Sequence, residues 1–237
     1  MNGLFSFFRR PRNNGDDTRL ERYKQFRELG RSYNLTLIKQ LPPPALPACG
    51  KKLGLYKAGT LILNQDDEIA VLYDYCLHHH RRAGKNIIER TLENAPPPEG
   101  SAEMTYLQAM SNAHFSLFRV EDIVSHRGAR LLDLLTETPV ELMDMGLSST
   151  GAPGVIMAGR LLAFDDFRMS SGTLIPLPDP IYETRIAPVI RKFMPGASPP
   201  AEAPLSATQK AAFEAQVLRI ALHAGGEDNS VYTDIEV

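Results

Sequence analysis

Apolar residues in the first half of the chain recur at helical spacing. In residues 17–32 they occupy every third position of a charged background, and in residues 65–82 they fall on one side of a helical wheel. Asn86, followed three residues later by a glutamate, and Ser101 are typical helix caps, so two shorter helices are expected after them. The prolines and glycines of residues 42–60 predict a loop interrupted by short pieces.

The hydrophobic pattern changes at residue 115, where short apolar runs separated by turn-forming residues begin. Each run has the alternating or continuous apolar character that is typical of a strand. The predicted strands are residues 115–123, 129–135, 139–145, 155–164 and 167–175. Five short strands suggest a small antiparallel barrel or sandwich, because closure would remove the exposed edges of the sheet.

Helical signals return in the last quarter of the chain. Asp179 followed by Pro180 predicts a helix start, and Pro188, which lies inside the apolar stripe of that helix, predicts a kink or a restart. Residues 195–204 are rich in proline, alanine and serine and are interpreted as a tether. Ser206, followed three residues later by a glutamine, predicts the cap of a last helix. The tether would allow this helix to pack on the core of the protein itself or in a groove of a partner.

These elements predict an α+β protein with an N-terminal helical module, a central small five-stranded antiparallel barrel-like or sandwich β segment, and C-terminal helices. Four regions are expected along the chain. They are a flexible tail over residues 1–16, a basic helical module over 17–114, a small acidic β module over 115–177, and helices on Pro-rich tethers with a loose tail over 178–237.

Charge is distributed unevenly between the two halves. Residues 1–90 contain 16 Lys and Arg against 9 Asp and Glu, whereas residues 91–237 contain 10 against 19. A basic half joined to an acidic half indicates a site for an anionic partner, or two halves that neutralise each other across an internal interface. The simplest alternative is an ordinary solvated surface.

Composition narrows the class of protein. With 43% hydrophobic and 23% charged residues, the chain has the make-up of a globular protein. Two cysteines, Cys49 and Cys76, match no redox or zinc motif and favour a reducing compartment. No apolar run approaches the roughly 18 residues of a membrane-spanning helix, and the N-terminal arginines follow the apolar residues instead of preceding them, unlike an export signal. A cytoplasmic protein without a membrane partner is expected.

A basic cluster follows the second predicted helix. The candidate residues for binding a partner or an anion are His78, Arg81, Arg82, Lys85 and Arg90. The helical wheel places His78 and Arg81 opposite the apolar side, so the cluster is expected to form a basic surface that could hold phosphates. The competing interpretation is a solvated helix end whose positive charges favour the helix C-terminus.

Cys76 and His80 are the candidate metal ligands, because residues four apart on a helix can reach one ion. A tetrahedral site needs two more ligands, for which Cys49, Glu89 and His114 are conceivable. The alternative is that Cys76 acts as a small buried hydrophobe and His80 as a hydrogen-bonded interior imidazole. No cofactor is expected.

Catalytic signatures are absent from the sequence. The glycines of residues 146–154 lack the lysine of a phosphate-binding loop, and Ser148 does not lie in a nucleophile elbow. We therefore expect a non-catalytic accessory or interaction protein whose partner is another protein. The alternatives are a protein that binds nucleic acid or a phosphate ligand through the basic helix end, and a metal-binding enzyme.

Overall fold

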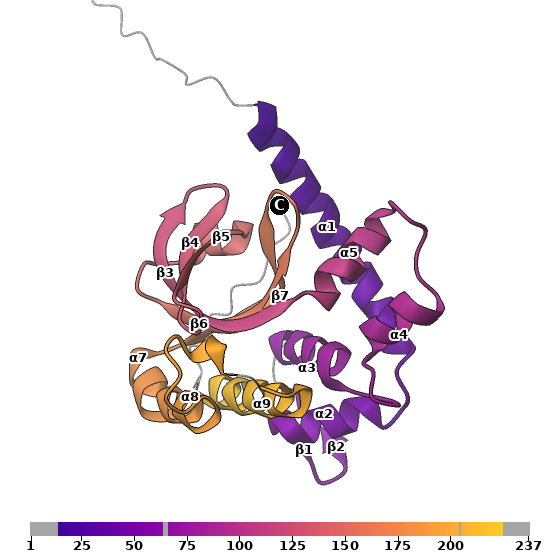
Figure 1. The fold of residues 1–237 in the computed structure, drawn as a ribbon, viewed down its shortest axis with the longest axis vertical. Coiled ribbons are helices and arrows are strands. Elements are labelled where there is room, and N and C mark those ends of the chain that lie inside the picture. Colours follow the sequence, from indigo (N-terminus) through magenta and orange to yellow (C-terminus); the bar gives the residue numbers. More distant parts are fainter. Residues whose placement is uncertain (1–13, 64–65, 204, 225–237) are drawn as a thin grey trace, which may run out of the picture.

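The computed structural model describes residues 14–63, 66–203 and 205–224. The predicted N-terminal tail up to residue 13 and the predicted C-terminal tail lie outside the described residues. Helices from both ends of the described chain lie against a curled antiparallel sheet (Figure 1). The predicted α+β class is confirmed.

Five helices and a hairpin precede the sheet. They are α1 (Asn14–Lys39), α2 (Ala45–Leu53), the strands β1 (Tyr56–Lys57) and β2 (Thr60–Leu61), α3 (Asp66–His79), α4 (Ile87–Asn94) and α5 (Ala102–Ser111). Both predicted caps are confirmed. The Glu89 amide donates to Asn86 Oδ1 at 2.8 Å while Glu89 Oε2 accepts from the Asn86 amide at 2.8 Å, and Ser101 Oγ accepts from the Met104 amide at 3.1 Å.

Helix α2 lies inside the segment that the sequence predicts as mainly loop. Pro47 stands in the first turn of α2, where a residue needs no amide hydrogen bond, so the proline is compatible with the helix. Gly54 ends the helix in the left-handed conformation at φ 79°. The prolines of this segment therefore position a helix start instead of preventing a helix.

The five predicted strands are confirmed. They are β3 (His114–Val124), β4 (Gly128–Asp133), β5 (Thr138–Met143), β6 (Ile156–Ala163) and β7 (Arg168–Leu177). The strand order is β5-β4-β3-β6-β7, and all neighbours are antiparallel. The sheet curls until β5 and β7 are in contact, but these two edge strands share no ladder within the described part of the chain. The result is a half-barrel.

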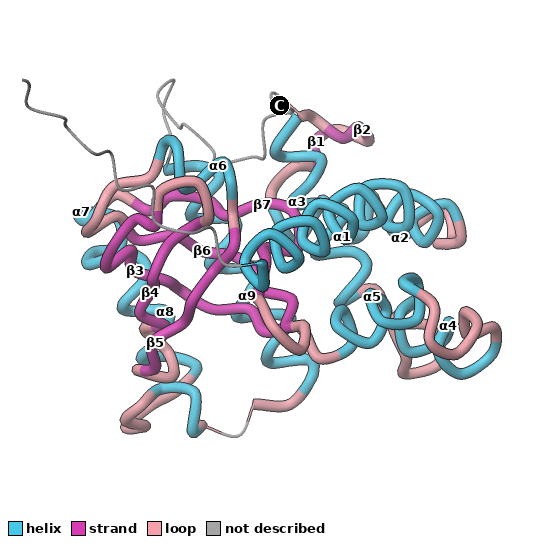
Figure 2. Tube along the Cα trace, turned by 90° about the horizontal axis from the view of Figure 1, so that it is seen from above, coloured by secondary structure: helices cyan, strands magenta, loops and turns pink. Residues whose placement is uncertain are grey.

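Two apolar cores lie on opposite faces of this sheet. Alternation along β6 directs Ile156 and Ala158 toward the helices, whereas Met157 contributes to the core on the other face, within the curl. The helix-facing core also contains Phe26 of α1 and Val217 of the last helix. Figure 2 shows from above how helices and strands lie together. The helical and β modules expected from sequence thus share one core.

Short helices follow β5 and β7. Helix α6 (Met145–Thr150) lies mostly between the predicted strands 139–145 and 155–164, and Asp144 caps it by accepting from the Leu147 amide at 2.9 Å. After β7, α7 (Asp179–Ile181) continues into a π-helical turn (Tyr182–Ile186) and then α8 (Ala187–Phe193). Helix α8 begins one residue before Pro188, which confirms the predicted restart.

The last helix, α9 (Ala207–Ala224), follows a short 3₁₀ turn (Pro200–Glu202) and has the predicted capping box. The Gln209 amide donates to Ser206 Oγ at 3.3 Å, and Gln209 Oε1 accepts from the Ser206 amide at 2.9 Å. Helix α9 packs on the protein's own core, one of the two arrangements that its tether allowed.

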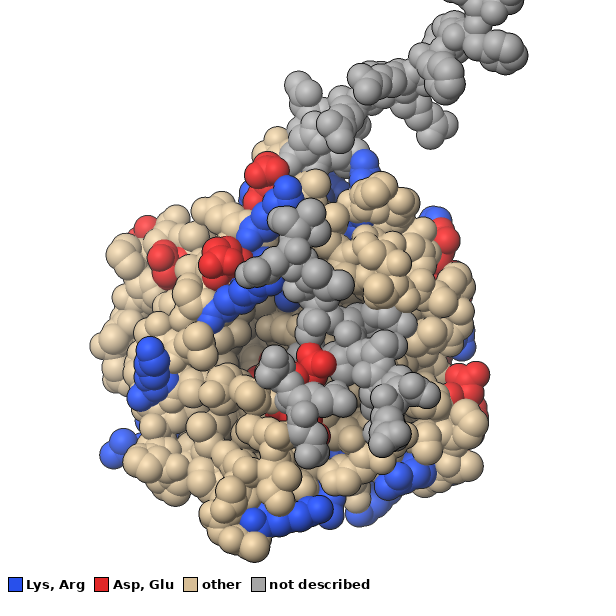
Figure 3. Space-filling model, turned by 180° about the vertical axis from the view of Figure 1, so that it is seen from behind, with Lys and Arg blue, Asp and Glu red and all other residues tan. Residues whose placement is uncertain are grey.

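Ion pairs join the basic half of the chain to the acidic half. Arg22 of α1 lies 2.6 Å from Asp166, and Arg27 lies 3.1 Å from Asp144. Basic and acidic side chains are interspersed on the face shown in Figure 3. Part of the charge difference between the two halves of the sequence is therefore neutralised across an internal interface. None of the helices in the described ranges combines the length and apolarity needed to traverse a bilayer.

Candidate functional site

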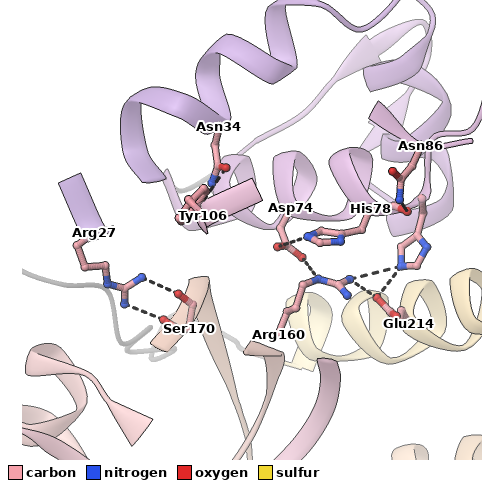
Figure 4. Close-up of polar contacts among 10 residues, drawn as sticks. Arg27, Asn34, Asp74, His78, Asn86, Tyr106, Arg160, Ser170 and Glu214 are labelled. Atoms are coloured by element: carbon pink, nitrogen blue, oxygen red, sulfur yellow. Dashed lines mark hydrogen bonds and ion pairs between the residues drawn. The ribbon is translucent and has the colours of Figure 1, made fainter. Parts of the chain in front are cut away.

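A buried charged side chain projects from the sheet into the helix layer. Arg160 of β6 shares the helix-facing side with Ala158 and is only 4% exposed. Its Nε donates to Asp74 Oδ2 of α3 at 3.1 Å, and its Nη2 donates to Glu214 Oε2 of α9 at 2.5 Å (Figure 4). The guanidinium therefore bridges one strand and two helices. We call Asp74, Arg160, Glu214 and the adjoining His79 the ionic network.

The charges of the ionic network sustain one another. Burial disfavours the charge of Arg160, but Glu214 and Asp74 outweigh it and raise the pKa of the guanidinium. Burial likewise opposes ionisation of Glu214, and Arg160 and His79 reverse this and lower the pKa of its carboxyl group. Both partners are charged at neutral pH. A buried pair of this kind stabilises only while each charge keeps its partner.

His79 closes the network on the side of α9. Its Nε2 lies 2.6 Å from Glu214 Oε2 and 3.4 Å from Arg160 Nη2, and its ring lies 4.8 Å from the Tyr75 ring. A carboxylate at this distance fixes the orientation of an imidazole. His79 is therefore held in place from one side by two charged groups.

His78, predicted to belong to an exposed basic surface, is buried, so this prediction is wrong. Helix α3 contacts α1, α2, α4, α9 and β7 and has no broad solvent-facing side. Burial, reinforced by Arg160 and His79, holds the pKa of His78 well below its usual value, so its ring is neutral. Within the described residues its Nε2 lacks a hydrogen-bond partner, and Asp74 Oδ1 lies 3.8 Å away.

Two of the other predicted basic residues are paired with acids of α4. Arg81 donates to Glu89 Oε2 at 3.0 Å, and Lys85 Nζ lies 2.5 Å from Glu93 Oε1. Glu89 and Glu93 are one helical turn apart, so the two basic side chains align with them.

The remaining two basic residues differ in exposure. Arg82 is exposed and forms a backbone bridge with Lys85, whereas Arg90 is half-buried. The proposed role of these side chains in binding a partner or an anion stays a prediction.

The candidate metal ligands Cys76 and His80 lie in different surroundings. Cys76 is buried in the helix-facing core next to Cys49, and His80 stands just beyond the end of α3. Two conceivable further ligands are engaged elsewhere, since His114 Nε2 lies 2.7 Å from Asp133 and Glu89 pairs with Arg81. In the described ranges no three His, Cys, Asp or Glu side chains gather in a metal-binding arrangement.

A cavity of about 690 Å³ lies between α2, α3, α8 and α9, and we call it the α9 cavity. His79 and His80 form part of its wall, together with the aromatic rings of Tyr75 and Phe193 and several alanines of α9. Its cationic lining residues are Lys52, Arg81, Lys192 and Arg219. Among the described residues that line it there is no carboxylate.

A second cavity, of about 250 Å³, lies at the other end of the ionic network, and we call it the Asp74 cavity. Asp74 is 20% exposed and faces this space together with Asn34 and Tyr106. Opposite Arg160 the pairing of β6 with β7 shifts register, from Gly159–Leu174 to Leu161–Ser170, so residues 171–173 of β7 form a bulge. The network therefore runs from the wall of one cavity to the wall of the other.

Comparison with known proteins gives a family and no activity. The model of a family of unknown function, DUF7986, matches residues 17–198. The chain belongs to the DUF7986 family. The DUF7986 region contains Asp74, His79 and Arg160, whereas Glu214 lies beyond it. A search of curated proteins found no match, and a search of solved structures found none either.

Sequence reasoning did not single out the three charged residues at the centre of this DUF7986 protein's network. Arg160 is the one charged residue in the apolar strand Ile156–Ala163, and Glu214 interrupts the apolar stripe of α9 between Phe213 and Val217. A charge in an apolar stripe is a usable signal, because such a residue is seldom buried without a partner. Asp74 gave no signal, since the helical wheel placed it on the side opposite the apolar residues.

Proposed function

We propose that this DUF7986 protein binds a small anionic molecule with an apolar body in the α9 cavity. The observation that carries the proposal is the charge of the lining, which has four cationic side chains and no carboxylate among its described residues. Arg81 is paired with Glu89, whereas Lys52, Lys192 and Arg219 have no acidic partner among the described residues. An anion would relieve the repulsion between them.

The size and walls of the cavity suit the same class of ligand. A volume of about 690 Å³ falls inside the range of small-molecule sites, and such sites are mainly apolar with a few polar groups that orient the ligand. Tyr75, Phe193 and the alanines of α9 supply the apolar walls. An anion with an aromatic or aliphatic body would use both the cations and these walls.

Two helix ends place the charges. The first turn of α9, at Ala207 and Thr208, lines the cavity, and a helix N-terminus favours negative charge. The Arg219 side chain lies over Gly54 at the C-terminus of α2, since a Cβ added to Gly54 would be 3.2 Å from Arg219 Nε. This position brings Arg219 near the end of α2 that carries Lys52.

Interaction with a protein partner stays a prediction. The large apolar side chains that are exposed in the described part of the chain are Leu35, on α1, and Ile62, directly after β2. They do not form the contiguous apolar patch that marks a protein interface. The cavity therefore supports a small ligand better than it supports a docking surface.

Fluorescence titration with anilinonaphthalene sulfonate, an anionic aromatic dye, tests the proposal. Inorganic phosphate, adenosine monophosphate and decanoate serve as anionic competitors, and adenosine and decanol as their neutral counterparts. We expect saturable binding that weakens with added salt and that anionic competitors displace better than neutral ones.

Charge reversal locates the binding. Lys52→Glu and Arg219→Glu should each weaken dye binding by on the order of tenfold, the effect of placing a like charge beside the anion. Lys57→Glu, which changes an exposed residue of β1 outside the cavity lining, should bind as the unmodified protein does. Equal affinity of all three variants would exclude the α9 cavity as the anion site.

A further inference from the structure

The Asp74 cavity lies between two helices that present opposite kinds of polar group. Arg27, Arg31 and Asn34 are four and three positions apart, so they share one face of α1, and all three line the cavity. Asp74 lines it from α3, which is in contact with α1. In Figure 4, Asn34 and Tyr106 lie between Arg27 and Asp74. Hydrogen-bond donors of α1 and a carboxylate of α3 therefore share one small space.

The Asp74 carboxylate has one oxygen that no described residue bonds. Its Oδ2 accepts from Arg160 Nε at 3.1 Å, whereas its Oδ1 accepts no hydrogen bond within the described ranges. His78 Nε2 lies 3.8 Å from Oδ1, which is too far for a hydrogen bond. A donor group of a ligand can therefore bind Oδ1 and leave the contact with Arg160 in place.

Asn34 has a donor to match. Its Oδ1 accepts from the Tyr106 hydroxyl at 3.4 Å, whereas its Nδ2 donates to no residue that the structure describes. Burial raises the pKa of Tyr106 to about 12, so this hydroxyl stays protonated at neutral pH. A Cβ added to Gly30 would lie 2.6 Å from Tyr106 Oη, so only glycine lets the hydroxyl come this close to α1. The Tyr106 hydroxyl thus occupies Asn34 Oδ1, and the Nδ2 donor remains for a ligand.

The sheet contributes its bulge to the same cavity. Ser171 and Gly172 line the cavity and belong to the three residues of β7 that have no partner in β6. A Cβ added to Gly172 would meet no atom within 4 Å, so the backbone borders open space here. Bulges are common next to functional sites.

We propose that the Asp74 cavity binds a zwitterionic amino acid with an apolar side chain. Its ammonium group donates to Asp74 Oδ1, and its carboxylate accepts from Asn34 Nδ2 beside the Arg31 guanidinium. Its side chain packs against Phe26 and Met169, which complete the lining. Both charges are needed, because an amine alone would meet the arginines of α1 and a carboxylate alone would meet Asp74. The volume of about 250 Å³ suits a molecule of this size.

Isothermal titration calorimetry with leucine tests the proposal. 4-Methylpentanoate is leucine without its ammonium group, and isoamylamine is leucine without its carboxylate. We expect saturable binding of leucine that is at least about tenfold tighter than binding of either analogue, because each charged group makes its own contact. An affinity for either analogue equal to that for leucine would overturn the proposal, as would an absence of binding by leucine, methionine and phenylalanine alike.

Substitutions on the two helices locate the site. Asn34→Asp, which replaces the Nδ2 donor with a carboxylate oxygen, and Asp74→Asn should each weaken leucine binding by on the order of tenfold. Asn112→Asp, the same change at an exposed position outside the cavity, is the control and should bind leucine as the unmodified protein does. If a melting curve shows that Asp74→Asn does not fold, Asn34→Asp decides the test.

Arg219→Glu separates this site from the proposed function, because Arg219 lines the α9 cavity and not the Asp74 cavity. Leucine should bind this variant with unchanged affinity, whatever happens to the binding of the anionic dye. Leucine binding that Arg219→Glu weakens and Asn34→Asp leaves intact would place leucine in the α9 cavity and overturn the proposal. Leucine binding without any binding of the dye would support the amino-acid site and contradict the anion site alone.

Discussion

Arg160 Nη2 donates to Glu214 Oε2 at 2.5 Å, and this contact joins the middle of the sheet to the last helix. The two residues are 54 positions apart, and both side chains are almost completely buried. Neither charge is stable in such surroundings without the other. The stability of the fold and the placement of His79 at the cavity therefore depend on the same pair.

Glu214→Gln should lower the free energy of unfolding by about 3–5 kcal/mol, because it removes one partner of a buried pair and leaves Arg160 with a single acid. Asp74→Asn should have a smaller effect, since Asp74 is 20% exposed and Arg160 would keep Glu214. Urea denaturation measures both, with Glu99→Gln, at an exposed position, as the control. Equal stability of Glu214→Gln and the control would show that the pair contributes nothing.

Stability should fall as pH drops below about 6.5, the ordinary pKa of histidine. Burial lowers the pKa of His78 in the folded state, so in this window the unfolded chain binds a proton that the folded protein does not. The contribution has a slope of up to about 1.4 kcal/mol per pH unit for one proton. Unfolding curves recorded at several values between about pH 7 and about pH 5 measure the slope.

His78→Gln should reduce this slope, because glutamine does not titrate. His126→Asn, at an exposed position, is the matched control and should keep the slope of the unmodified protein. If His78→Gln and the unmodified protein depend equally on pH, another group is responsible for the loss of stability.

Removing α9 should abolish the cooperative thermal transition. The helix supplies Glu214 to the ionic network and Phe213 and Val217 to the core, where the Phe213 ring contacts Phe115 and Phe193. Circular dichroism of a chain that ends at residue 204, followed during heating, makes the measurement. A truncated protein that melts like the full chain would instead support a role for α9 in docking to a partner.

Asp133→Asn should destabilise the sheet by about 1–3 kcal/mol. The Asp133 carboxylate accepts from Ser116 Oγ at 2.5 Å and from the Leu135 amide at 2.9 Å, and it also contacts His114. Burial opposes its ionisation, but these hydrogen bonds prevail and lower the pKa of Asp133, so its contribution is present above about pH 4 and is lost in more acidic solution. Urea unfolding at neutral and acidic pH should show a smaller acid-induced loss for the variant, and equal losses would contradict the assignment.

Local interactions explain what could be predicted. The boundaries of the five strands agree with prediction to within a few residues because alternation and turn residues act over short distances. The caps at Asn86, Ser101 and Ser206 were likewise readable, since each cap bonds an amide three residues away. Helix α2 differs from the prediction because a proline interrupts a helix in its interior but not in its first turn, where Pro47 stands.

The sequence by itself determined the five strands of the sheet, the longer helices and the α+β class of this protein, because those depend on periodicity and on contacts between near neighbours. The tertiary structure decided everything that requires distant residues to meet. Arg160 reaches Asp74 across 86 positions, and His78 loses its solvent-exposed side because other elements surround α3. The wheel of one helix fixes which residues share a face, but only packing decides whether that face meets water or an opposite charge.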